Sequence, residues 1–290
     1  MLQFLTLGFF QGAVYGLLAV GLVLVYRGAR VFNFAQAEFG TVAAYVMYAL
    51  WAGLGLPMGV GMVAGLGAAL LLGLLTERLV IRPLFDASRI TVLVATVGVA
   101  LLIIGITIIA GKAEPREIDP LLPGEFVLLN TFVSSQQILV LATLLALAAA
   151  LALFFRRTTL GLAVLATSQD PFATQIVGIS VPGMSRLIWT MAAFLGGIAG
   201  ILQAPIAFIT PGFMTVKFLV PAFAGAVLGG MTSLPGAFLG GILIGVAEQL
   251  GIYWLGDLHL GVPGAGEFTV FMLLLLVLLI RPQGILGKEA

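Results

Sequence analysis

Long apolar stretches, separated by short polar or charged segments, recur along the whole chain. A helix needs about 20 apolar residues to cross roughly 30 Å of hydrocarbon, and most of these stretches reach that length. The pattern therefore predicts an all-α, polytopic membrane protein. The predicted helices cover 4–26, 32–53, 58–80, 90–111, 137–155, 187–209, 218–231, 235–253 and 267–280.

The C-terminal third is the least regular part of this pattern. Segment 218–231 is short for a full span, and residues 232–235 separate it from the next apolar stretch. Non-helical backbone at membrane depth must be shielded by protein or must line a water-filled cavity. We therefore expect about eight or nine transmembrane helices, including broken or re-entrant segments.

Composition strengthens the membrane assignment and excludes several classes of protein. Hydrophobic residues make up 61% of the 290 residues and charged residues 9%, whereas soluble domains have about 25% charged residues. Residues 1–290 are expected to form a single transmembrane domain. The chain has no cysteine, which excludes disulfides and thiolate metal sites, and its net charge of +1 comes without a basic run for nucleic acid.

The placement of lysine and arginine predicts the orientation, because cytoplasmic loops carry the excess of positive charge. With the N-terminus outside and the C-terminus cytoplasmic, most basic residues fall on the cytoplasmic side. Those predicted to be cytoplasmic are Arg27, Arg30, Arg78, Arg82, Arg89, Arg156, Arg157, Arg186, Arg281 and Lys288; those predicted to be outside are Lys112, Arg116 and Lys217.

Glycines four residues apart recur in five of the predicted helices. This spacing exposes bare backbone on one helix face and permits close helix crossings. It predicts packing and not chemistry. The residues are Gly8, Gly12 and Gly16; Gly61 and Gly65; Gly196 and Gly200; Gly225 and Gly229; and Gly241 and Gly245.

Two glutamates lie within apolar stretches, where an ionisable side chain is costly and therefore marks a function or a specific partner. Glu38 has Asn33 and Gln36 nearby; the group either lines a translocation pathway or forms a helix start at the interface beside Arg27 and Arg30. Glu248 either lines a pathway or makes a buried interhelical hydrogen bond. By contrast, His259 and Asp257 are expected in an exposed outer loop.

The longest predicted cytoplasmic segment, 156–186, contains the sequence signals of short helices and is not a simple linker. Asp170 followed by Pro171 is typical of a helix N-cap and first turn, and Gly178 of a helix end. This predicts a short helix over 171–177, preceded by another over 160–168. Short helices at a membrane face suit docking to a soluble partner or form an interfacial pair.

Four segments in order resemble the LivH-type permease subunits of bacterial branched-chain amino acid ABC importers. They are Tyr15-Gly16-Leu17-Leu18-Ala19-Val20-Gly21 with Asn33-Phe34-Ala35 and Glu38; Thr158 to Ile179 with Gly161, Ala163, Asp170-Pro171 and Gly178; Leu228 to Ala237 continuing to Glu248; and Arg281-Pro282-Gln283-Gly284. The chain departs from the family pattern at Gln36-Ala37, where His-Gly is usual, and at Leu162 and Leu165, where arginines are common.

The resemblance implies a permease subunit of the bacterial inner membrane that translocates branched-chain or other amino acids. It implies a LivM-type second permease subunit, two ATP-binding cassette ATPases that hold ATP and Mg²⁺, and an extracytoplasmic solute-binding protein, with no cofactor on this chain. Pathway candidates are then Asn33, Gln36, Glu38 and Glu248, and ATPase-coupling candidates are Gly161, Ala163, Asp170, Pro171 and Gly178.

Three alternatives remain open. Urea or short-chain amides are carried by very similar permeases, and a stand-alone transporter could couple to protons or sodium through Glu38 or Glu248. An intramembrane enzyme would need a nucleophile–base pair or metal ligands, and the sequence offers neither. No Gly-x4-Gly-Lys-Ser/Thr phosphate loop is present, so the chain is not expected to hydrolyse ATP itself.

Overall fold

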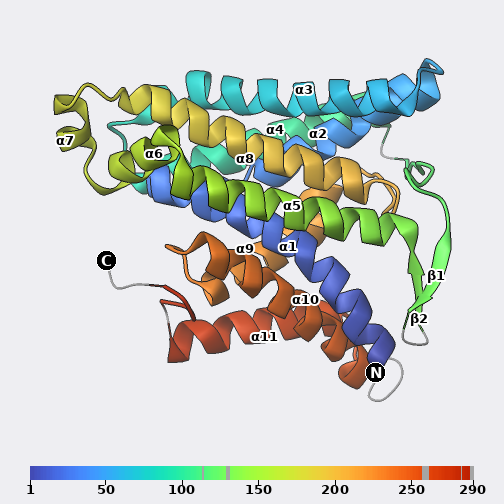
Figure 1. Ribbon diagram of the computed structural model, residues 1–290. Coiled ribbons are helices and arrows are strands. Elements are labelled where there is room, and N and C mark those ends of the chain that lie inside the picture. Colours follow the sequence, from blue (N-terminus) through green and yellow to red (C-terminus); the bar gives the residue numbers. More distant parts are fainter. Residues whose placement is uncertain (113, 129–130, 257–260, 282, 288–290) are drawn as a thin grey trace. The chain divides into compact units, whose positions relative to one another are not determined.

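Helices form nearly all of the structure, a computed structural model that describes residues 1–112, 114–128, 131–256, 261–281 and 283–287 (Figure 1). Asp257, His259, Pro282 and Lys288 lie outside the described residues. The elements are α1 (Leu2–Ala29), α2 (Gln36–Tyr48), α3 (Met58–Thr76), α4 (Arg89–Gly111), β1 (Glu125–Leu128), β2 (Thr131–Ser134), α5 (Ser135–Arg157), α6 (Thr159–Gln169), α7 (Pro171–Ile176), α8 (Val181–Gln203), α9 (Val220–Gly229), α10 (Leu234–Leu255) and α11 (Ala265–Ile280).

Six helical segments within the described residues are long and apolar enough to cross a membrane. Two shorter apolar helical segments, Thr215–Gly229 and Ala265–Ile280, accompany them. The six are Leu2–Ala29, Met58–Leu84, Arg89–Gly111, Ser135–Arg157, Val181–Gln203 and Leu234–Leu255. The predicted all-α membrane architecture is confirmed at this level.

The chain divides into two compact units, and the boundary runs through α1 and α5. Unit 1 comprises 1–23, 120–149 and 217–290; unit 2 comprises 24–119 and 150–216.

Unit 1 is built on glycine contacts of α10 with α1 and α9. A Cβ added to Gly12 of α1 would lie 2.6 Å from the Ile242 carbonyl oxygen, and one on Gly225 of α9 would lie 2.7 Å from the Gly241 Cα. Backbones that approach this closely bring many atoms into van der Waals contact, which drives helix association where lipid replaces water.

Unit 2 is built in the same way from α2, α3 and α8. A Cβ on Gly61 of α3 would lie 2.8 Å from the Met47 carbonyl oxygen, and one on Gly40 of α2 would lie 2.5 Å from the Gly196 carbonyl oxygen. Gly200, also on α8, meets the backbone of Gly40 as well. The predicted role of the glycine pairs in packing is therefore confirmed in both units.

Two predicted helices have wrong boundaries. The helix expected over 32–53 begins at Gln36, because Asn33 Oδ1 accepts a hydrogen bond from Ala35 N at 3.0 Å and holds the preceding chain in a turn. Its last residues, Ala49–Gly53, form a wider π-type turn. The helix expected over 187–209 runs from Val181 to Gln203.

The shift of α8 follows from its capping residues. Ser180 Oγ accepts from Gly183 N at 3.2 Å, and Pro182 occupies the first turn, where its missing N–H is not needed. The sequence also did not predict β1 and β2 of unit 1, which pair antiparallel from Glu125 opposite Ser134 to Leu128 opposite Thr131.

Candidate functional site

A row of polar side chains runs along one face of α2 in unit 2. Glu38, Thr41 and Tyr45 are three and four residues apart, a spacing that places them on the same side of a helix. Glu38 and Thr41 are fully buried, and Tyr45 is half-buried. The row gives unit 2 a buried polar surface within an otherwise apolar helix.

Glu38 is the most unusual member of this row. Its carboxylate faces the hydroxyls of Thr215 and Thr41, and a Cβ on Gly212 would lie 3.8 Å from Oε1. The two hydroxyls and the Thr215 N–H lie close to the carboxylate, but none of them meets the geometry of a hydrogen bond, and neither carboxylate oxygen has another partner in the described part of the chain. A buried carboxylate without a cation is costly, although its place in the first helical turn is favourable. The site can accept a cationic or hydrogen-bond-donating group.

Asn33 and Gln36, predicted to accompany Glu38, are fully buried. Asn33 precedes α2, and its side-chain oxygen accepts a hydrogen bond from Ala35 N. The Gln36 carbonyl lies where α2 crosses α8, 2.5 Å from the Cβ position of Gly196. The structure thus brings Glu38 together with Thr41 and Thr215.

Glu248, on α10 of unit 1, is part of a hydrogen-bonded chain between two helices. The Tyr15 hydroxyl of α1 donates to Glu248 Oε2 at 2.6 Å, and Gln11 Nε2 donates to the Tyr15 oxygen at 3.2 Å. The interhelical hydrogen bond considered for Glu248 is therefore present. The pathway role of Glu248 stays a prediction.

Arg116 organises a second polar cluster in unit 2, in the segment after α4. Its guanidinium donates to the Tyr48 hydroxyl at 3.3 Å and to the Gly111 carbonyl at 3.2 Å, and stands 5.2 Å from the Tyr48 ring centre. The hydrogen bond to Tyr48 raises the pKa of the guanidinium, which therefore stays charged. Arg116 also pairs through its backbone with Ile209. The cluster joins α2 and α4 to the segment that follows α8.

The coupling segment predicted over 156–186 contains the two expected short helices, α6 and α7. Asp170 Oδ1 accepts from Ala173 N at 2.9 Å as the N-cap of α7, Pro171 begins that helix, and Gly178 ends it with a φ of +85°. These local predictions are confirmed. Gly161 lies against the Phe154 and Phe155 backbone, so the absence of a side chain permits the tight turn between α5 and α6.

The surface of this segment is apolar where a soluble helix would be polar. Phe172 on α7 is 75% exposed, and Ile176 and Val177 are exposed to a similar degree. Leu160 and Leu162 of α6 are exposed as well, whereas Ala163 is half-buried. Exposed apolar patches of this kind are candidates for interaction surfaces.

Sequence reasoning missed four residues of these clusters. Thr41 and Tyr45 could have been found from their spacing with Glu38 along one helix face. Tyr15 and Thr215 carry no local signal, because each reaches its glutamate from a distant part of the chain. Within the residues described, no three His, Cys, Asp or Glu side chains gather where they could hold a metal ion.

Membrane-length apolar helices and glycine-mediated packing define a polytopic membrane protein. The chain belongs to the family described as branched-chain amino acid transport system, permease component, which matches residues 4–280. The predicted family and the predicted location, as a multi-pass inner-membrane protein, are confirmed.

Relatives of the chain are similar along almost their entire length. The high-affinity branched-chain amino acid transport system permease protein BraD of Pseudomonas aeruginosa is 34% identical, with 99% of this chain and 96% of the relative covered. LivH of Escherichia coli is 28% identical over the same shares, and the probable LivH of Methanocaldococcus jannaschii is 29% identical over 94% and 88%.

A solved structure shares the fold at low sequence identity. PsaBC from Streptococcus pneumoniae in complex with Fab matches with a TM-score of 0.51 and 15% identity, covering 97% of this chain and 92% of that one. This likeness concerns the fold alone.

Proposed function

We propose that the chain is the transmembrane permease subunit of an ABC importer that passes branched-chain or other amino acids across the inner membrane. The observation that carries the proposal is the family match over residues 4–280, together with relatives named for branched-chain amino acid transport. The partners would be a LivM-type permease subunit, two ATP-binding cassette ATPases that hold ATP and Mg²⁺, and an extracytoplasmic solute-binding protein. ATP hydrolysis would take place on the ATPases.

The topology we propose has eight or nine membrane segments, the N-terminus outside and the C-terminus cytoplasmic. The six long helical segments, the two shorter ones and α2 would together supply nine. The segment Thr215–Gly229 would then enter the membrane although it is shorter than the six long helical segments. Support for the orientation comes from the distribution of lysine and arginine.

Coupling to the ATPases is proposed to run through α6 and α7. Phe172 and Ile176 of α7, with Val177 directly after it, form an exposed apolar face. This face is the surface that would bind the ATPase. Asp170 and Gly178 fix the start and end of α7, so they would orient this face. ATP-driven movement of the ATPases would then bias the permease between outward and inward access.

A matched pair of variants tests the docking face. Phe172→Asp is expected to reduce ATPase binding to the purified permease about tenfold or more, because the aspartate charge would have to be buried against the partner. Phe132→Asp is the control, since Phe132 is also a highly exposed phenylalanine, 71% against 75%, but lies on β2. Equal loss of binding in both variants would contradict the assignment.

Variants of the α7 ends test the same coupling by another route. Asp170→Ala removes the N-cap, and Gly178→Val forces a β-branched residue into a left-handed conformation, so both are expected to uncouple transport from ATP hydrolysis. Membrane insertion should be unaffected, because both residues are exposed. Unchanged ATPase binding and transport in both variants would rule the segment out.

Transport assays distinguish the proposed function from its alternatives. Proteoliposomes holding the permease with its proposed partners should accumulate leucine or isoleucine only with ATP and the binding protein. Preferential uptake of urea or short-chain amides would reassign the substrate. Uptake by this chain alone without ATP, lost on Glu38→Gln, would instead identify an ion-coupled secondary transporter.

A further inference from the structure

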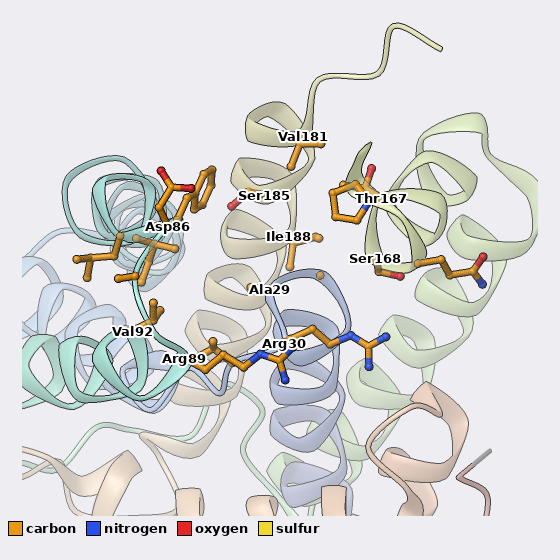
Figure 2. A pocket seen from close by; sticks show the side chains of 18 of the residues that line it. Ala29, Arg30, Asp86, Arg89, Val92, Thr167, Ser168, Val181, Ser185 and Ile188 are labelled. Atoms are coloured by element: carbon orange, nitrogen blue, oxygen red, sulfur yellow. The ribbon is translucent and has the colours of Figure 1, made fainter. Parts of the chain in front are cut away.

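Unit 2 contains a groove of about 740 Å³. It lies where the end of α1, the connection between α3 and α4, and helices α6 to α8 come together (Figure 2). Its size falls within the range of sites for small organic ligands. Every lining residue belongs to unit 2.

Two arginines, Arg30 and Arg89, contribute their positive charges to this groove. Figure 2 shows their side chains along one edge, with Asp86 at another part of the lining. Arg27 also lies close enough to Arg30 for their charges to repel. Ion pairs within the described residues join Arg82 to Glu77 and Arg116 to Glu114, so neither groove arginine has a carboxylate partner there. Like charges gathered in this way favour an anion between them.

The backbone of Arg30 gives an independent sign that its side chain is needed. Arg30 has a φ of +55° directly after α1, in the left-handed region where helix ends usually have glycine. Its N–H donates to the Tyr26 carbonyl at 2.8 Å and closes the last turn. A glycine would close this turn with less strain but without a guanidinium.

Part of the groove lining is apolar, and the neighbouring stretch of α4 exposes apolar side chains. Leu84, Phe85 and Val92 line it, and beyond Arg89 the outer face of α4 exposes Ile90 and Val94, which are 75% and 60% accessible. A ligand that satisfies both parts has an anionic head and an apolar tail. The predicted cytoplasmic position of Arg30 and Arg89 adds a source of such ligands, because that leaflet holds anionic lipid.

We infer that the groove binds the phosphate headgroup of an anionic phospholipid between Arg30 and Arg89, with the acyl chains along α4. Residues Ser168, Pro171 and Gln175 of α6 and α7 form the opposite wall. The lipid therefore braces the segment 159–178 against the rest of unit 2. The significance of this bracing for coupling rests on the proposed function, whereas the binding itself does not.

Native mass spectrometry of the purified full-length chain in detergent tests the binding. Phosphatidylglycerol is titrated against phosphatidylethanolamine with the same acyl chains, and inorganic phosphate is added as a competitor. Arg30→Gln and Arg89→Gln are each expected to weaken phosphatidylglycerol binding about fivefold, and the double variant about twentyfivefold. Arg186→Gln is the matched control, since Arg186 is exposed beside the groove residue Ser185 but does not line the groove.

A second variant separates binding from folding. Arg30→Gly relieves the left-handed backbone, so its thermal midpoint should be unchanged or higher while phosphatidylglycerol binding falls as in Arg30→Gln. Hydrogen exchange of 159–178 should slow on adding phosphatidylglycerol to the wild type and not to the double variant.

Three outcomes would overturn the inference. They are equal binding of both lipids, equal weakening by Arg186→Gln, and displacement of the lipid by millimolar inorganic phosphate, which would identify a soluble anion site. Loss of ATPase binding in the double variant without any lipid present would instead make the groove a protein-docking site. The three lipid-binding outcomes do not depend on the proposed function.

Discussion

Each of the two compact units holds a glutamate within closely packed apolar helices, but the hydrogen-bond partners of the two glutamates differ. In unit 1, Glu248 accepts a hydrogen bond of 2.6 Å from Tyr15, which in turn accepts one from Gln11. In unit 2, Glu38 is fully buried and faces the hydroxyls of Thr41 and Thr215 without a hydrogen bond in the described part of the chain.

This difference separates two uses of the same side chain. A glutamate with a tyrosine partner on another helix ties the helices together, and interhelical hydrogen bonds in membranes contribute about 0.6 kcal/mol on average. A buried glutamate without such a partner contributes little to packing and keeps its oxygens available for a ligand. Glu38 is therefore the stronger pathway candidate, and Glu248 the stronger structural one.

The largest expected effect comes from the glycine contacts that both units share. Gly200→Leu in unit 2 and Gly241→Leu in unit 1 should each destabilise the fold by about 3 kcal/mol or more, because their Cβ positions overlap backbone atoms of Gly40 and Gly16. Thermal unfolding in detergent measures this loss. Gly98→Leu is the control, since nothing lies within 4 Å of its Cβ position; comparable destabilisation there would mean that helix interiors in general reject leucine.

The next largest effect should distinguish the two glutamates in transport. Glu38→Gln is expected to lower ATP-driven amino acid uptake by the reconstituted importer more than tenfold, roughly the loss of one charge-assisted hydrogen bond to the passing substrate. Glu248→Gln should lower it less than threefold, because glutamine still accepts from Tyr15. An equal fall in uptake in both variants would contradict the assignment of Glu38 to the pathway and of Glu248 to helix packing.

A smaller effect concerns how each glutamate is held. A double-mutant cycle with Tyr15→Phe and Glu248→Gln should give a coupling energy of about 1 kcal/mol in thermal unfolding, since each change removes part of a hydrogen bond of 2.6 Å. The matching cycle with Thr215→Val and Glu38→Gln should give a coupling near zero. A larger coupling in the second cycle would show that Thr215 does hold Glu38.

The smallest expected effect lies at the outer end of the Gln11–Tyr15–Glu248 chain. Gln11→Ala should destabilise unit 1 by about 0.5 kcal/mol, because the hydrogen bond it donates is 3.2 Å long and only partly buried. The same substitution in a Tyr15→Phe background should have almost no effect on the unfolding midpoint. An equal effect in both backgrounds would place Gln11 outside the hydrogen-bonded chain.

Local chemistry explains what could be predicted about the coupling segment and the glycine helices. Asp170, Pro171 and Gly178 act on their own backbone within a few residues, so the bounds of α7 follow from sequence alone. The glycine spacing likewise predicts which helix face is bare. The start of α2 was missed for a related reason, because the Asn33 side chain competes for backbone groups that a helix would use.

The remaining features depend on contacts across long stretches of sequence. Glu248 and Tyr15 are 233 residues apart, and neither carries a signal for the other. Arg30 follows α1 and Arg89 begins α4, and the two meet only in the groove of unit 2. The exposed apolar face of α7 could not be predicted either, since exposure is a property of the folded chain and not of a helix taken alone.

The amino-acid sequence by itself determined that the chain lies in a membrane, that its helices pack through glycine, and where α7 begins and ends. Each of these follows from hydrophobic length, residue size or a side chain's reach to its neighbouring backbone. Only the tertiary structure decided which glutamate has a hydrogen-bond partner and which arginines share a groove. Those outcomes require distant segments to come within a few ångströms, and periodicity along one helix contains no information about its partner.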